Sequence, residues 1–532
     1  VSAEENWLPP DNFQQYPAPL IATRTSPTNM GMSLLADLAA NDFGYITISQ
    51  SLDRIDKTLT TMEKLERYRG HFYNWYDTRT LKVLPPYYIS SVDSGNLAGS
   101  LLTLAAGLAE FKHQPIITAS AFEGLLDTFK VFVESLDAAT QKSLASEINR
   151  LNEVLNSSIS RQTVISIDKT ADILENIKHS SEVIAEMLVT DIDEESRYWI
   201  QAFNLQVSAL LDSHTTLLAE SSPSDPMPTL HVLAASQNVH ALSNLNRIDA
   251  LIHRCHTVAI MDFGFLYDSK AELLTIGFDV TERRRDLACY DLLASEARLA
   301  SFMLIAQGQV PQKRWFALGR LLTSHGGDIS LISWSGSMFE YLMPQLIMPS
   351  YADTLLDHSC KAAVSRQIQY GRQRSVPWGI SESCYNTTDL NQVYQYRAFG
   401  VPGLGFKRGL GEDLVIAPYA TALVLMVMPR EACMNLQALE EQGFSDDYGF
   451  YEAIDYTPLR VPRNKSYAIV QSFMAHHQGM SLLSFAHVLL DQPMQRRFLS
   501  DPQIRATELL LQERVPKQSA TLHPHAAEVS AT

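Results

Sequence analysis

Residues 376–419 have the sequence VPWGISESCYNTTDLNQVYQYRAFGVPGLGFKRGLGEDLVIAPY, and we interpret the rest of the chain as organised around this stretch. Glu382 has Trp378, Ile380 and Tyr385 close to it in sequence and no charged neighbour. Five glycines punctuate the second half, which makes the stretch too long for a simple connection. Long irregular loops in compact domains are functional or disordered, and this one is too aromatic for disorder. The sequence therefore predicts a long loop that forms a site.

A carboxylate among aromatic rings is typical of a carbohydrate site. Flat rings stack on pyranose faces, and carboxylates act as proton donor, nucleophile or hydroxyl acceptor in sugar chemistry. The alternative is a buried structural loop in which Glu382 forms a salt bridge, and composition alone leaves both open. Under the first interpretation, the residues of this stretch that contact substrate are Trp378, Tyr385, Tyr396 and Phe399.

The composition describes a soluble globular protein with ample apolar material for a core. The 532 residues are 46% hydrophobic and 19% charged, and this length allows several average domains or one large barrel or toroid. The formal net charge of −17 argues against nucleic acid or an anionic membrane as the main partner, because those interactions need clustered Lys and Arg. A neutral ligand such as a glucan is compatible with this charge.

The cysteines indicate neither a disulfide framework nor a zinc site. All five are widely spaced and none forms a CxxC pair, so we expect reduced thiols in a reducing compartment. No apolar run reaches the roughly 18 residues that a membrane-spanning helix needs. The chain opens VSAEENWLPP, without an initiating Met or a signal-peptide pattern, and we expect it to be a piece of a longer protein.

The N-terminal region predicts a pair of antiparallel helices. Residues 6–31 begin as a proline-rich extended lead-in and end at a helix start, where Ser26 can cap and Pro27 fits the first helical position. We expect this helix to end at Gly44 and a second amphipathic helix to follow near 50–67. Two helices joined by a short loop form an αα-hairpin.

A second cluster of aromatic and acidic residues follows these helices. Trp75, Tyr76 and Asp77 lie in one predicted loop, and we assign all three to substrate binding. Asp93 then starts an apolar helix. Aspartate is a favoured N-cap, so a structural role explains Asp93 well. A carboxylate at a helix start beside a central cavity can also contact a substrate, and the two roles are compatible.

The segment from about 113 to 235 differs in character from the rest. It is rich in Ser, Thr, Asp, Glu and Lys, has helical patterns with few aromatic residues, and contains a linker-like break at 221–229. We predict a helical insertion or scaffold within a single domain of residues 1–532. Residues 257–281 have the clearest strand signals and predict a small hairpin about a turn that contains Asp268.

Residues 286–306 predict a long helix that carries a second carboxylate. On this helix Glu296 would share a stripe with Leu292, Leu299 and Met303, at offsets of −4, +3 and +7. A carboxyl group on an apolar stripe is desolvated, which raises its pKa and favours the protonated form that a general acid needs near neutral pH. The alternative is a glutamate that is ion-paired inside the core.

The segment YGFYEAIDYTP, residues 448–458, combines aromatic and acidic residues in the same way as the central stretch. Tyr451 and Glu452 are candidates for substrate binding. Glu452 and Asp455 are also the main rivals of Glu382 as the second catalytic carboxylate.

His476 and His477 are adjacent, so they cannot point the same way from a helix, and no third ligand stands at metal spacing. We therefore expect no zinc site. His476 and Gln478 are candidates for hydrogen bonds to sugar hydroxyls, although packing and capping explain them nearly as well. Taken together, about a dozen helical segments with very few strand signals predict an all-α fold of helical hairpins around a central cavity.

Ten motifs follow one another in the order NWLPPDNFQ, HFYNWYDTR, SSVDSGNLAG, YDLLASEARLASF, SWSGSMFEYLMP, VPWGISES, QYRAFGVPGLG, DLVIAPYATAL, YGFYEAIDYTP and MAHHQGMSLL. Together they closely resemble the middle, glycoamylase-like domain of bacterial cyclic β-1,2-glucan synthases, which is the cyclisation domain in that family. The likeness extends from about residue 6 to ATELLLQERVP and is weakest across the helical segment of 113–235.

This resemblance implies an (α/α)₆ toroid and an anomer-retaining transglycosylation that closes linear β-1,2-glucan into rings with little hydrolysis. It implies that Glu296, in YDLLASEARL, is the acid/base and that Glu382, in WGISES, is the nucleophile. No metal or organic cofactor is needed. Cys289 stands where an aromatic residue is expected before YDLLASEARL, which could alter a subsite but leaves the acid in place.

The resemblance also implies partners and a location. Full-length family members carry glycosyltransferase and phosphorylase-like domains on either side, and this chain contains no such segment. By this likeness the substrate is linear β-1,2-glucan and the chain belongs to a larger membrane-anchored synthase, on the cytoplasmic side of the bacterial inner membrane. Two alternatives stay open: an endo-β-1,2-glucanase on the same scaffold, and a non-catalytic glucan-binding module of a synthase.

Overall fold

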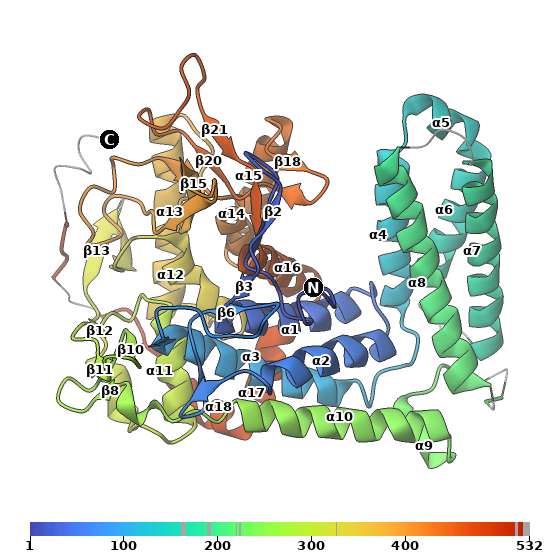
Figure 1. Ribbon diagram of the computed structural model, residues 1–532, viewed down its shortest axis with the longest axis horizontal. Helices are drawn as coiled ribbons and strands as arrows, with labels where there is room; N and C mark the ends of the chain where they lie inside the picture. Colours follow the sequence, from blue (N-terminus) through green and yellow to red (C-terminus); the bar gives the residue numbers. More distant parts are fainter. Residues whose placement is uncertain are drawn as a thin grey trace. The chain divides into compact units, whose positions relative to one another are not determined.

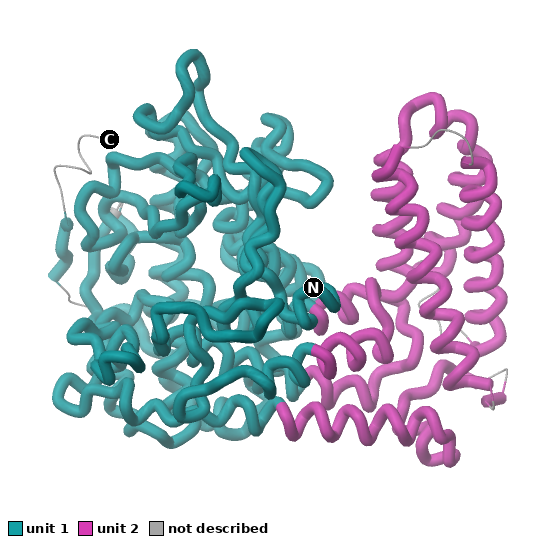
Figure 2. The backbone as a smooth tube through the Cα atoms, in the orientation of Figure 1, with its two compact units in different colours: residues 1–36, 58–106, 255–532 teal, residues 37–57, 107–254 magenta. Residues whose placement is uncertain are grey.

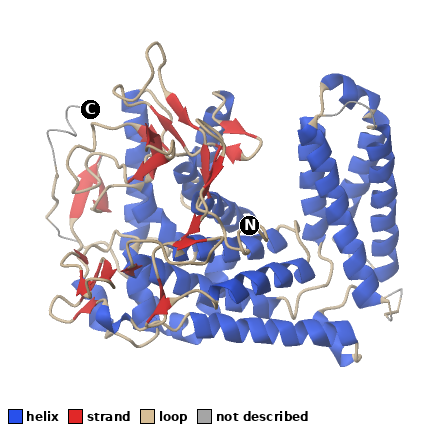
Figure 3. Cartoon of the chain, viewed as in Figure 1, coloured by secondary structure: helices blue, strands red, loops and turns tan. Residues whose placement is uncertain are grey.

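Helices dominate the computed structural model, and short antiparallel strands lie between them (Figures 1 and 3). The chain divides into two compact units (Figure 2). The first comprises residues 1–36, 58–106 and 255–532, and the second comprises residues 37–57 and 107–254. The structure describes residues 1–160, 166–188, 193–219, 221–222, 225–325, 327–516 and 520–524.

The second unit is a bundle in which α4 packs on α6 and α8, and α7 also packs on α6 and α8. Three aromatic rings pack within its largely aliphatic core: the Phe129 ring contacts those of Phe132 and Phe203, at centroid distances of 6.0 and 5.5 Å. Asp193 caps α8 by accepting a hydrogen bond from the Ser196 amide. The helices of this region are α4 (Ala119–Ser135), α5 (Ala138–Ser143), α6 (Ala145–Ser160), α7 (Ile167–Met187), α8 (Glu194–Leu218), α9 (Leu230–Ala235) and α10 (Val239–Val258).

The predicted helical segment of 113–235 falls within the second unit. Its residues 161–165, 189–192, 220 and 223–224 lie outside the described part of the chain. That it is an insertion or scaffold within one catalytic domain stays a prediction.

The N-terminal helices are α1 (Pro27–Asp42), α2 (Ile48–Met62) and α3 (Ser91–Glu110). Among its described residues, the first unit contains the short 3₁₀ helices η1 (Phe263–Phe265), η2 (Gln312–Ala317), η3 (Met343–Leu346) and η4 (Glu508–Gln512). The α-helices of its C-terminal part are α11 (Ala297–Ala306), α12 (Met338–Leu342), α13 (Leu355–Arg374), α14 (Pro418–Val424), α15 (Pro429–Glu441), α16 (Ala475–Leu489), α17 (Pro493–Ser500) and α18 (Pro502–Thr507).

The strands form small two- and three-stranded sheets, among them β2-β1-β22, β17-β20-β21 and the hairpin β15-β16. The strands of the N-terminal region are β1 (Asn12–Gln14), β2 (Leu20–Ile21), β3 (Arg24–Thr25), β4 (Arg67–Tyr68), β5 (His71–Phe72), β6 (Tyr76–Asp77) and β7 (Tyr88–Ser90). Those of the middle region are β8 (Tyr267–Asp268), β9 (Leu273–Thr275), β10 (Gly277–Asp279), β11 (Arg284–Arg285), β12 (Cys289–Tyr290), β13 (Leu322–His325) and β14 (Asp328–Leu331). Those that follow are β15 (Ser383–Thr388), β16 (Tyr394–Arg397), β17 (Val415–Ile416), β18 (Ser445–Asp446), β19 (Gly449–Phe450), β20 (Ala453–Asp455), β21 (Ala468–Val470) and β22 (Ser472–Met474).

Local signals placed several elements correctly. Helix α1 begins at Pro27, and the Ser26 hydroxyl accepts a hydrogen bond from the Asn29 amide at 3.2 Å. The predicted hairpin around Asp268 is formed by β8 and β9. The expected capping role of Asp93 is wrong, because the Ser90 hydroxyl caps α3 by accepting from the Asp93 amide at 3.3 Å. The carboxylate of Asp93, in the first turn, is left for other contacts.

The predicted helix over 286–306 is wrong in its first half. Helix α11 begins only at Ala297, and Cys289 and Tyr290 instead form β12, which pairs with β9. Sheet pairing with a distant strand has overridden the local helical pattern, as tertiary context commonly does. Glu296 therefore immediately precedes the helix, and its predicted stripe with Leu292 does not exist, although Leu299 and Met303 are buried.

The central stretch of 376–419 is not one irregular loop. It contains the hairpin β15-β16, with a bulge between Tyr385 and Thr388, and Glu382 is the residue just before β15. A glycine is required at position 400, because a Cβ there would lie 1.7 Å from the Ser335 carbonyl oxygen. This close approach packs the stretch against the backbone before α12.

Candidate active site

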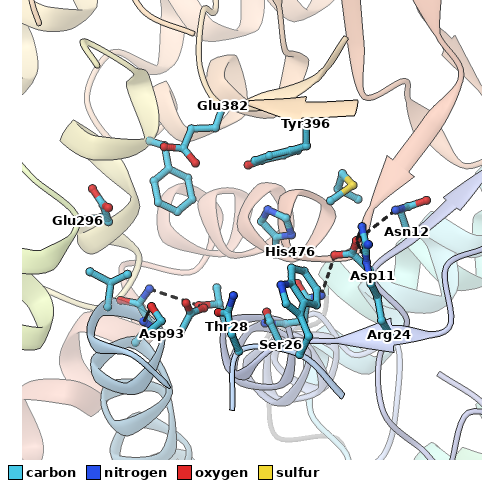
Figure 4. Close-up of a pocket in the computed structure, with 18 of the residues that line it drawn as sticks. Asp11, Asn12, Arg24, Ser26, Thr28, Asp93, Glu296, Glu382, Tyr396 and His476 are labelled. Atoms are coloured by element: carbon cyan, nitrogen blue, oxygen red, sulfur yellow. Dashed lines mark hydrogen bonds and ion pairs between the residues drawn. The ribbon is translucent and has the colours of Figure 1, made fainter. Parts of the chain in front are cut away.

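A cavity of about 450 Å³ lies in the first unit, within the size range of small-molecule sites (Figure 4). Six of the predicted site residues line it, and polar residues that the sequence did not single out line much of the rest. The six are Trp75, Asp93, Glu296, Glu382, Tyr396 and His476.

Both predicted catalytic carboxyls reach this cavity, Glu296 from the turn before α11 and Glu382 from the residue before β15. Burial, followed by the charge of Glu340, raises the pKa of Glu296 to about 7. Burial, followed by the charges of Glu296 and Glu340, raises the pKa of Glu382 to about 8. The pair therefore retains a proton near neutral pH, so one carboxyl can act as an acid while the other ionises. The higher pKa places this proton on Glu382 rather than on Glu296, the reverse of the roles that the family resemblance implies.

Glu340 is a buried carboxylate outside the cavity lining, and hydrogen bonds fix its position. It accepts from the amides of Trp334, Ser335 and Ser337 at 3.0, 3.1 and 3.1 Å. The Ser333 hydroxyl donates to it at 2.9 Å, and the Ser337 hydroxyl at 3.2 Å. So many donors hold the negative charge in place, and that charge raises the pKa of both cavity carboxyls.

Arg298 ties the turn that carries Glu296 to α12. Its side chain is buried, and its Nη1 donates to the carbonyls of Ser295 at 3.1 Å and Glu340 at 2.8 Å. The Ser295 hydroxyl also contacts Glu296 Oε2 at 3.2 Å. These contacts position Glu296 in place of the helical stripe that the sequence predicted.

Another wall of the cavity is formed by the starts of α1 and α3. The Thr28 hydroxyl donates to Asp93 Oδ1 at 2.5 Å. Asn74, in the amide orientation that satisfies both neighbours, donates to Asp93 at 3.2 Å and accepts from Trp75 Nε1 at 3.1 Å. In Figure 4, Asp93 and Thr28 lie across the cavity from Glu382. Carboxylate, amide and hydroxyl groups beside an indole ring suit the hydroxyls and the flat face of a sugar.

An ion pair extends this wall. Arg24 Nη2 lies 2.9 Å from Asp11 Oδ2, and the Arg24 guanidinium lies 4.8 Å from the centre of the Trp75 ring. Asn29 donates to the other Asp11 oxygen at 3.2 Å. The ion pair fixes both the indole and the acid at the edge of the cavity.

Neither rival carboxylate lines the cavity. Asp455 is fully buried, and its Oδ2 lies 2.6 Å from Arg460 Nε. The Glu452 carboxyl is buried against His477, with Oε2 at 3.0 Å from Nδ1. Both groups already have protein partners, whereas Glu296 and Glu382 face the open space.

The other predicted binding residues do not line the cavity either. The Tyr76 hydroxyl donates to the Glu66 carbonyl, Asp77 accepts from the amides of its own turn, and the Tyr451 hydroxyl donates to Asp446. Aromatic packing and backbone contacts account for the remaining four. These are Trp378, held by Asn435; Tyr385, between the guanidinium groups of Arg397 and Arg460; Phe399, beside Tyr385; and Gln478, whose amide donates to the Phe450 carbonyl.

Several lining residues were missed, notably Asp11, Asn12, Arg24, Asn29 and Asn96. The first three belong to the segment that the sequence analysis interpreted as an extended lead-in. The signal that could have found Asn29 and Asn96 is an amide side chain at a buried position of a predicted helix. A buried polar side chain needs a partner, and a ligand is one such partner.

Among the described residues, no group of three or more His, Cys, Asp or Glu side chains is arranged to hold a metal ion. No helix within that part of the chain is both long and apolar enough to cross a membrane.

The fold is shared with solved structures of low sequence identity. One is an endo-β-1,2-glucanase from Chitinophaga pinensis, with a TM-score of 0.55 and 14% identity over 96% of each chain. Another is an endo-β-1,2-glucanase from Talaromyces funiculosus, with a TM-score of 0.51 and 10% identity over 97% of this chain and 90% of that one. The chain therefore shares its fold with two endo-β-1,2-glucanases, and two carboxyl groups line its cavity.

A more particular relationship follows from sequence. Residues 290–502 match the Glycoamylase family. Over 525 residues, or 97% of its length, the chain is 38% identical to the cyclic β-(1,2)-glucan synthase NdvB of Rhizobium meliloti. It spans only 18% of that relative. The resemblance to the glycoamylase-like domain of cyclic β-1,2-glucan synthases is confirmed.

Proposed function

We propose that this chain is an anomer-retaining transglycosylase that cyclises linear β-1,2-glucan with little hydrolysis. The observation that carries the proposal is the pair Glu296 and Glu382, which face one polar cavity with raised pKa values in a chain 38% identical to a cyclic β-(1,2)-glucan synthase. Two carboxyl groups flanking a glycosidic bond are the usual apparatus of glycoside chemistry.

In the proposed first step, the Glu296 carboxylic acid donates its proton to the glycosidic oxygen while the Glu382 carboxylate attacks C1. The C1–O bond breaks, the reducing-end segment leaves with the proton, and a glycosyl-enzyme ester forms on Glu382. In the second step, Glu296 removes the proton from the 2-hydroxyl at the far end of the same chain. That oxygen attacks C1, Glu382 departs as a carboxylate, and a ring with a new β-1,2 bond is released.

Ring closure requires one tethered hydroxyl to compete with water at about 55 M. A well-positioned intramolecular group can reach effective molarities of about 10⁵ M or more, so positioning and exclusion of water supply the preference. The groups that can position the chain in this cavity are Trp75 with its Arg24 contact, Asp93 with Thr28, and Tyr396.

Three further proposals follow from the same resemblance. We propose that the helices of the first unit form an (α/α)₆ toroid around the cavity. The full-length protein would carry flanking glycosyltransferase and phosphorylase-like domains, consistent with the 18% of the relative that the chain spans. The whole would act at the cytoplasmic side of the bacterial inner membrane.

The test is incubation of the purified chain with linear β-1,2-glucan, followed by assays for new reducing ends and for products that resist an exo-acting β-glucosidase. Cyclisation yields resistant products without new reducing ends, because the released segment keeps the one reducing end of the substrate. Glu296→Gln and Glu382→Gln should both abolish these products.

A second candidate function is hydrolysis, and the shared fold with two endo-β-1,2-glucanases favours it. Reducing ends that rise in step with substrate consumption would establish a glucanase and overturn the cyclase. No change in either assay, with glucan binding that persists in both variants, would instead identify a non-catalytic glucan-binding module.

A further inference from the structure

A line of polar side chains leads from the buried Glu452 to the cavity carboxyl Glu382. Glu452 Oε2 lies 3.0 Å from His477 Nδ1, and His477 Nε2 lies 3.4 Å from the Tyr396 hydroxyl. In Figure 4 that hydroxyl points toward the Glu382 carboxyl, and its interaction with the carboxylate lowers the pKa of Glu382. We call Glu452, His477 and Tyr396 the hydrogen-bond chain.

The middle of this chain is held rigidly. The His477 ring is 1% exposed and stacks on the Tyr419 ring, with centroids 3.5 Å apart and planes 8° from parallel. The Tyr419 hydroxyl in turn lies 2.8 Å from Ser381 Oγ and 2.9 Å from the Glu382 carbonyl oxygen. The imidazole of His477 therefore has a fixed position relative to the backbone of Glu382. What can vary is the position of the protons along the hydrogen-bond chain.

The direction of the hydrogen bonds follows from the chemistry of a neutral imidazole, which has one donor and one acceptor nitrogen. Burial raises the pKa of Glu452 well above its ordinary value and lowers the pKa of His477 well below its own, and both directions favour the neutral acid beside the neutral imidazole. His477 Nδ1 lies 3.1 Å from Oε1 and 3.0 Å from Oε2 of Glu452, and Oε1 also accepts from the Cys384 amide at 3.1 Å. A protonated Glu452 would therefore donate from Oε2 to His477 Nδ1.

With Nδ1 as acceptor, the proton of His477 is on Nε2 and points to the Tyr396 oxygen. Tyr396 is 39% exposed overall, yet burial and then the charge of Glu382 raise the pKa of its hydroxyl well above the ordinary value. The hydroxyl therefore keeps its proton and can donate to Glu382. In the opposite arrangement, a Glu452 carboxylate would accept from Nδ1–H, and Nε2 would accept the Tyr396 proton. Glu382 would then lose its donor. The protonation state of Glu452 and His477 thus decides whether the Tyr396 hydroxyl donates to Glu382 or to His477.

We propose that Glu452 and His477 are positioning residues, which hold Tyr396 as a hydrogen-bond donor to Glu382 and so stabilise its carboxylate as nucleophile and leaving group. This inference rests on the proposed role of Glu382. It also accounts for a buried acid and a buried histidine that the mechanism does not otherwise use. A donor aimed at a carboxylate favours the ionised form, which a nucleophile needs.

Other groups act on the same carboxyls. Glu296 and Glu340 raise the pKa of Glu382, and Lys407 lowers it; Asp11 raises the pKa of Glu452, and the Cys384 and Met474 amides lower it. Burial lowers the pKa of the adjacent His476 to about 3, so His476 stays neutral throughout the assay range. The variants below leave all these groups in place, and differences among the variants report on the hydrogen-bond chain.

The first measurement is the pH dependence of kcat/KM for cyclisation by wild type and Tyr396→Phe. Loss of the donor raises the pKa of Glu382, so the acidic limb of the profile should move up by about one pH unit, with an about tenfold loss of rate on that limb. Tyr448→Phe removes a hydroxyl from a residue that is 62% exposed and outside the cavity lining, and it serves as the matched control.

Two substitutions at position 477 separate the two nitrogens. The amide nitrogen of His477→Gln occupies the place of Nε2 and can still donate to Tyr396, so this variant should keep the wild-type acidic limb. The amide of His477→Asn reaches only the place of Nδ1, so this variant should shift the limb as Tyr396→Phe does. A purely structural histidine would give no such split, and identical profiles for the two variants would overturn the proposal.

Glu452→Gln tests the direction of the hydrogen-bond chain. The Cys384 amide holds an oxygen at Oε1, so the new amide nitrogen faces Nδ1 as a donor and the acidic limb should stay in place. A shift as large as that of Tyr396→Phe would show that Glu452 acts as a carboxylate acceptor and would refute the proposed direction. Thermal unfolding of each variant confirms that it is folded.

Glu382→Gln separates this inference from the proposed function. If that variant stays active, Glu382 is not the nucleophile and the proposed function fails at its site. If it is inactive while Tyr396→Phe leaves the acidic limb unmoved, the proposed function stands and the positioning role alone is refuted.

Discussion

Residues 376–383 and 449–457 both place acidic side chains beside aromatic ones, yet their carboxyls have different surroundings. Glu382 faces the cavity, where burial and neighbouring charges raise its pKa to about 8. Asp455 is fully buried against Arg460, and Glu452 is bound to His477. An acid among aromatic residues is therefore not sufficient to make a catalytic site. The difference is that Asp455 and Glu452 are paired with a basic side chain away from the cavity, whereas Glu382 lines the cavity.

The contrast between the two regions would be wrong if Glu382 were dispensable for activity. The largest predicted effect is therefore that of Glu382→Gln. Glu382→Gln should lower the rate of cyclisation by about 10³-fold or more, because the amide cannot form the glycosyl ester. The measurement is the initial rate of formation of products resistant to exo-acting β-glucosidase. Glu431→Gln, the same exchange at an exposed position in the first turn of α15, should leave the rate unchanged.

The opposite expectation holds for Asp455. Asp455→Asn removes one of the two carboxylates that pair with Arg460 and leaves Asp413, which lies 2.6 Å from its Nη1. Breaking a buried ion pair in this way should lower the free energy of unfolding by about 3 kcal/mol, measured by denaturant titration. The rate per folded molecule should change by less than about threefold. Normal stability with a loss of activity comparable to that of Glu382→Gln would make Asp455 a catalytic carboxylate and reverse the comparison.

Two tryptophans extend the comparison to the aromatic residues. Trp75 lines the cavity under the Arg24 guanidinium, whereas Trp378 is 8% exposed and packs away from the cavity. Trp75→Ala should raise KM for linear β-1,2-glucan by about tenfold, the equivalent of about 1.4 kcal/mol of stacking. Trp378→Phe should leave KM unchanged and lower the free energy of unfolding by about 1–2 kcal/mol. Equal effects on KM would show that cavity lining does not identify the sugar-binding rings.

Some of the fold and part of the candidate site could be predicted from the sequence, including the two carboxyls that face the cavity. Ser26 and Pro27 mark a helix start through contacts within one turn, and the structure confirms it. The motifs around Glu296 and Glu382 also carry a family likeness that does not depend on knowing the fold. What failed were inferences about partners distant in sequence. The helical pattern before Ala297 gave way to pairing between β12 and β9, which no local signal encodes.

The same limit applies to the binding residues. Tyr385 and Phe399 share the aromatic stretch with Tyr396, yet Tyr396 faces the cavity while Tyr385 packs between two guanidinium groups. Alternation along the hairpin β15-β16 sends side chains to opposite faces, and the side that carries the site is set by tertiary packing. Asp11 was missed for the converse reason, because its segment has no regular pattern to place it.

The smallest predicted effect concerns stability, and it tests whether ionisation of the two cavity carboxyls destabilises the folded state. Burial raises the pKa of Glu296 to about 7 and that of Glu382 to about 8, whereas an unfolded glutamate titrates near about 4.3. The folded state therefore binds the protons of these two carboxyls more tightly than the unfolded state does. The stability that this proton binding contributes is fully present below the unfolded pKa and is lost as the pH rises through 7 to 8. Glu382→Gln cannot ionise, so its Tm should exceed that of wild type by about 2 °C at pH 8.5 and differ little at pH 5. Thermal unfolding, followed by circular dichroism between those pH values, measures the difference in Tm. If the variant were less stable than wild type at pH 8.5, the protein would be shown to stabilise the Glu382 carboxylate as fully as that of Asp455.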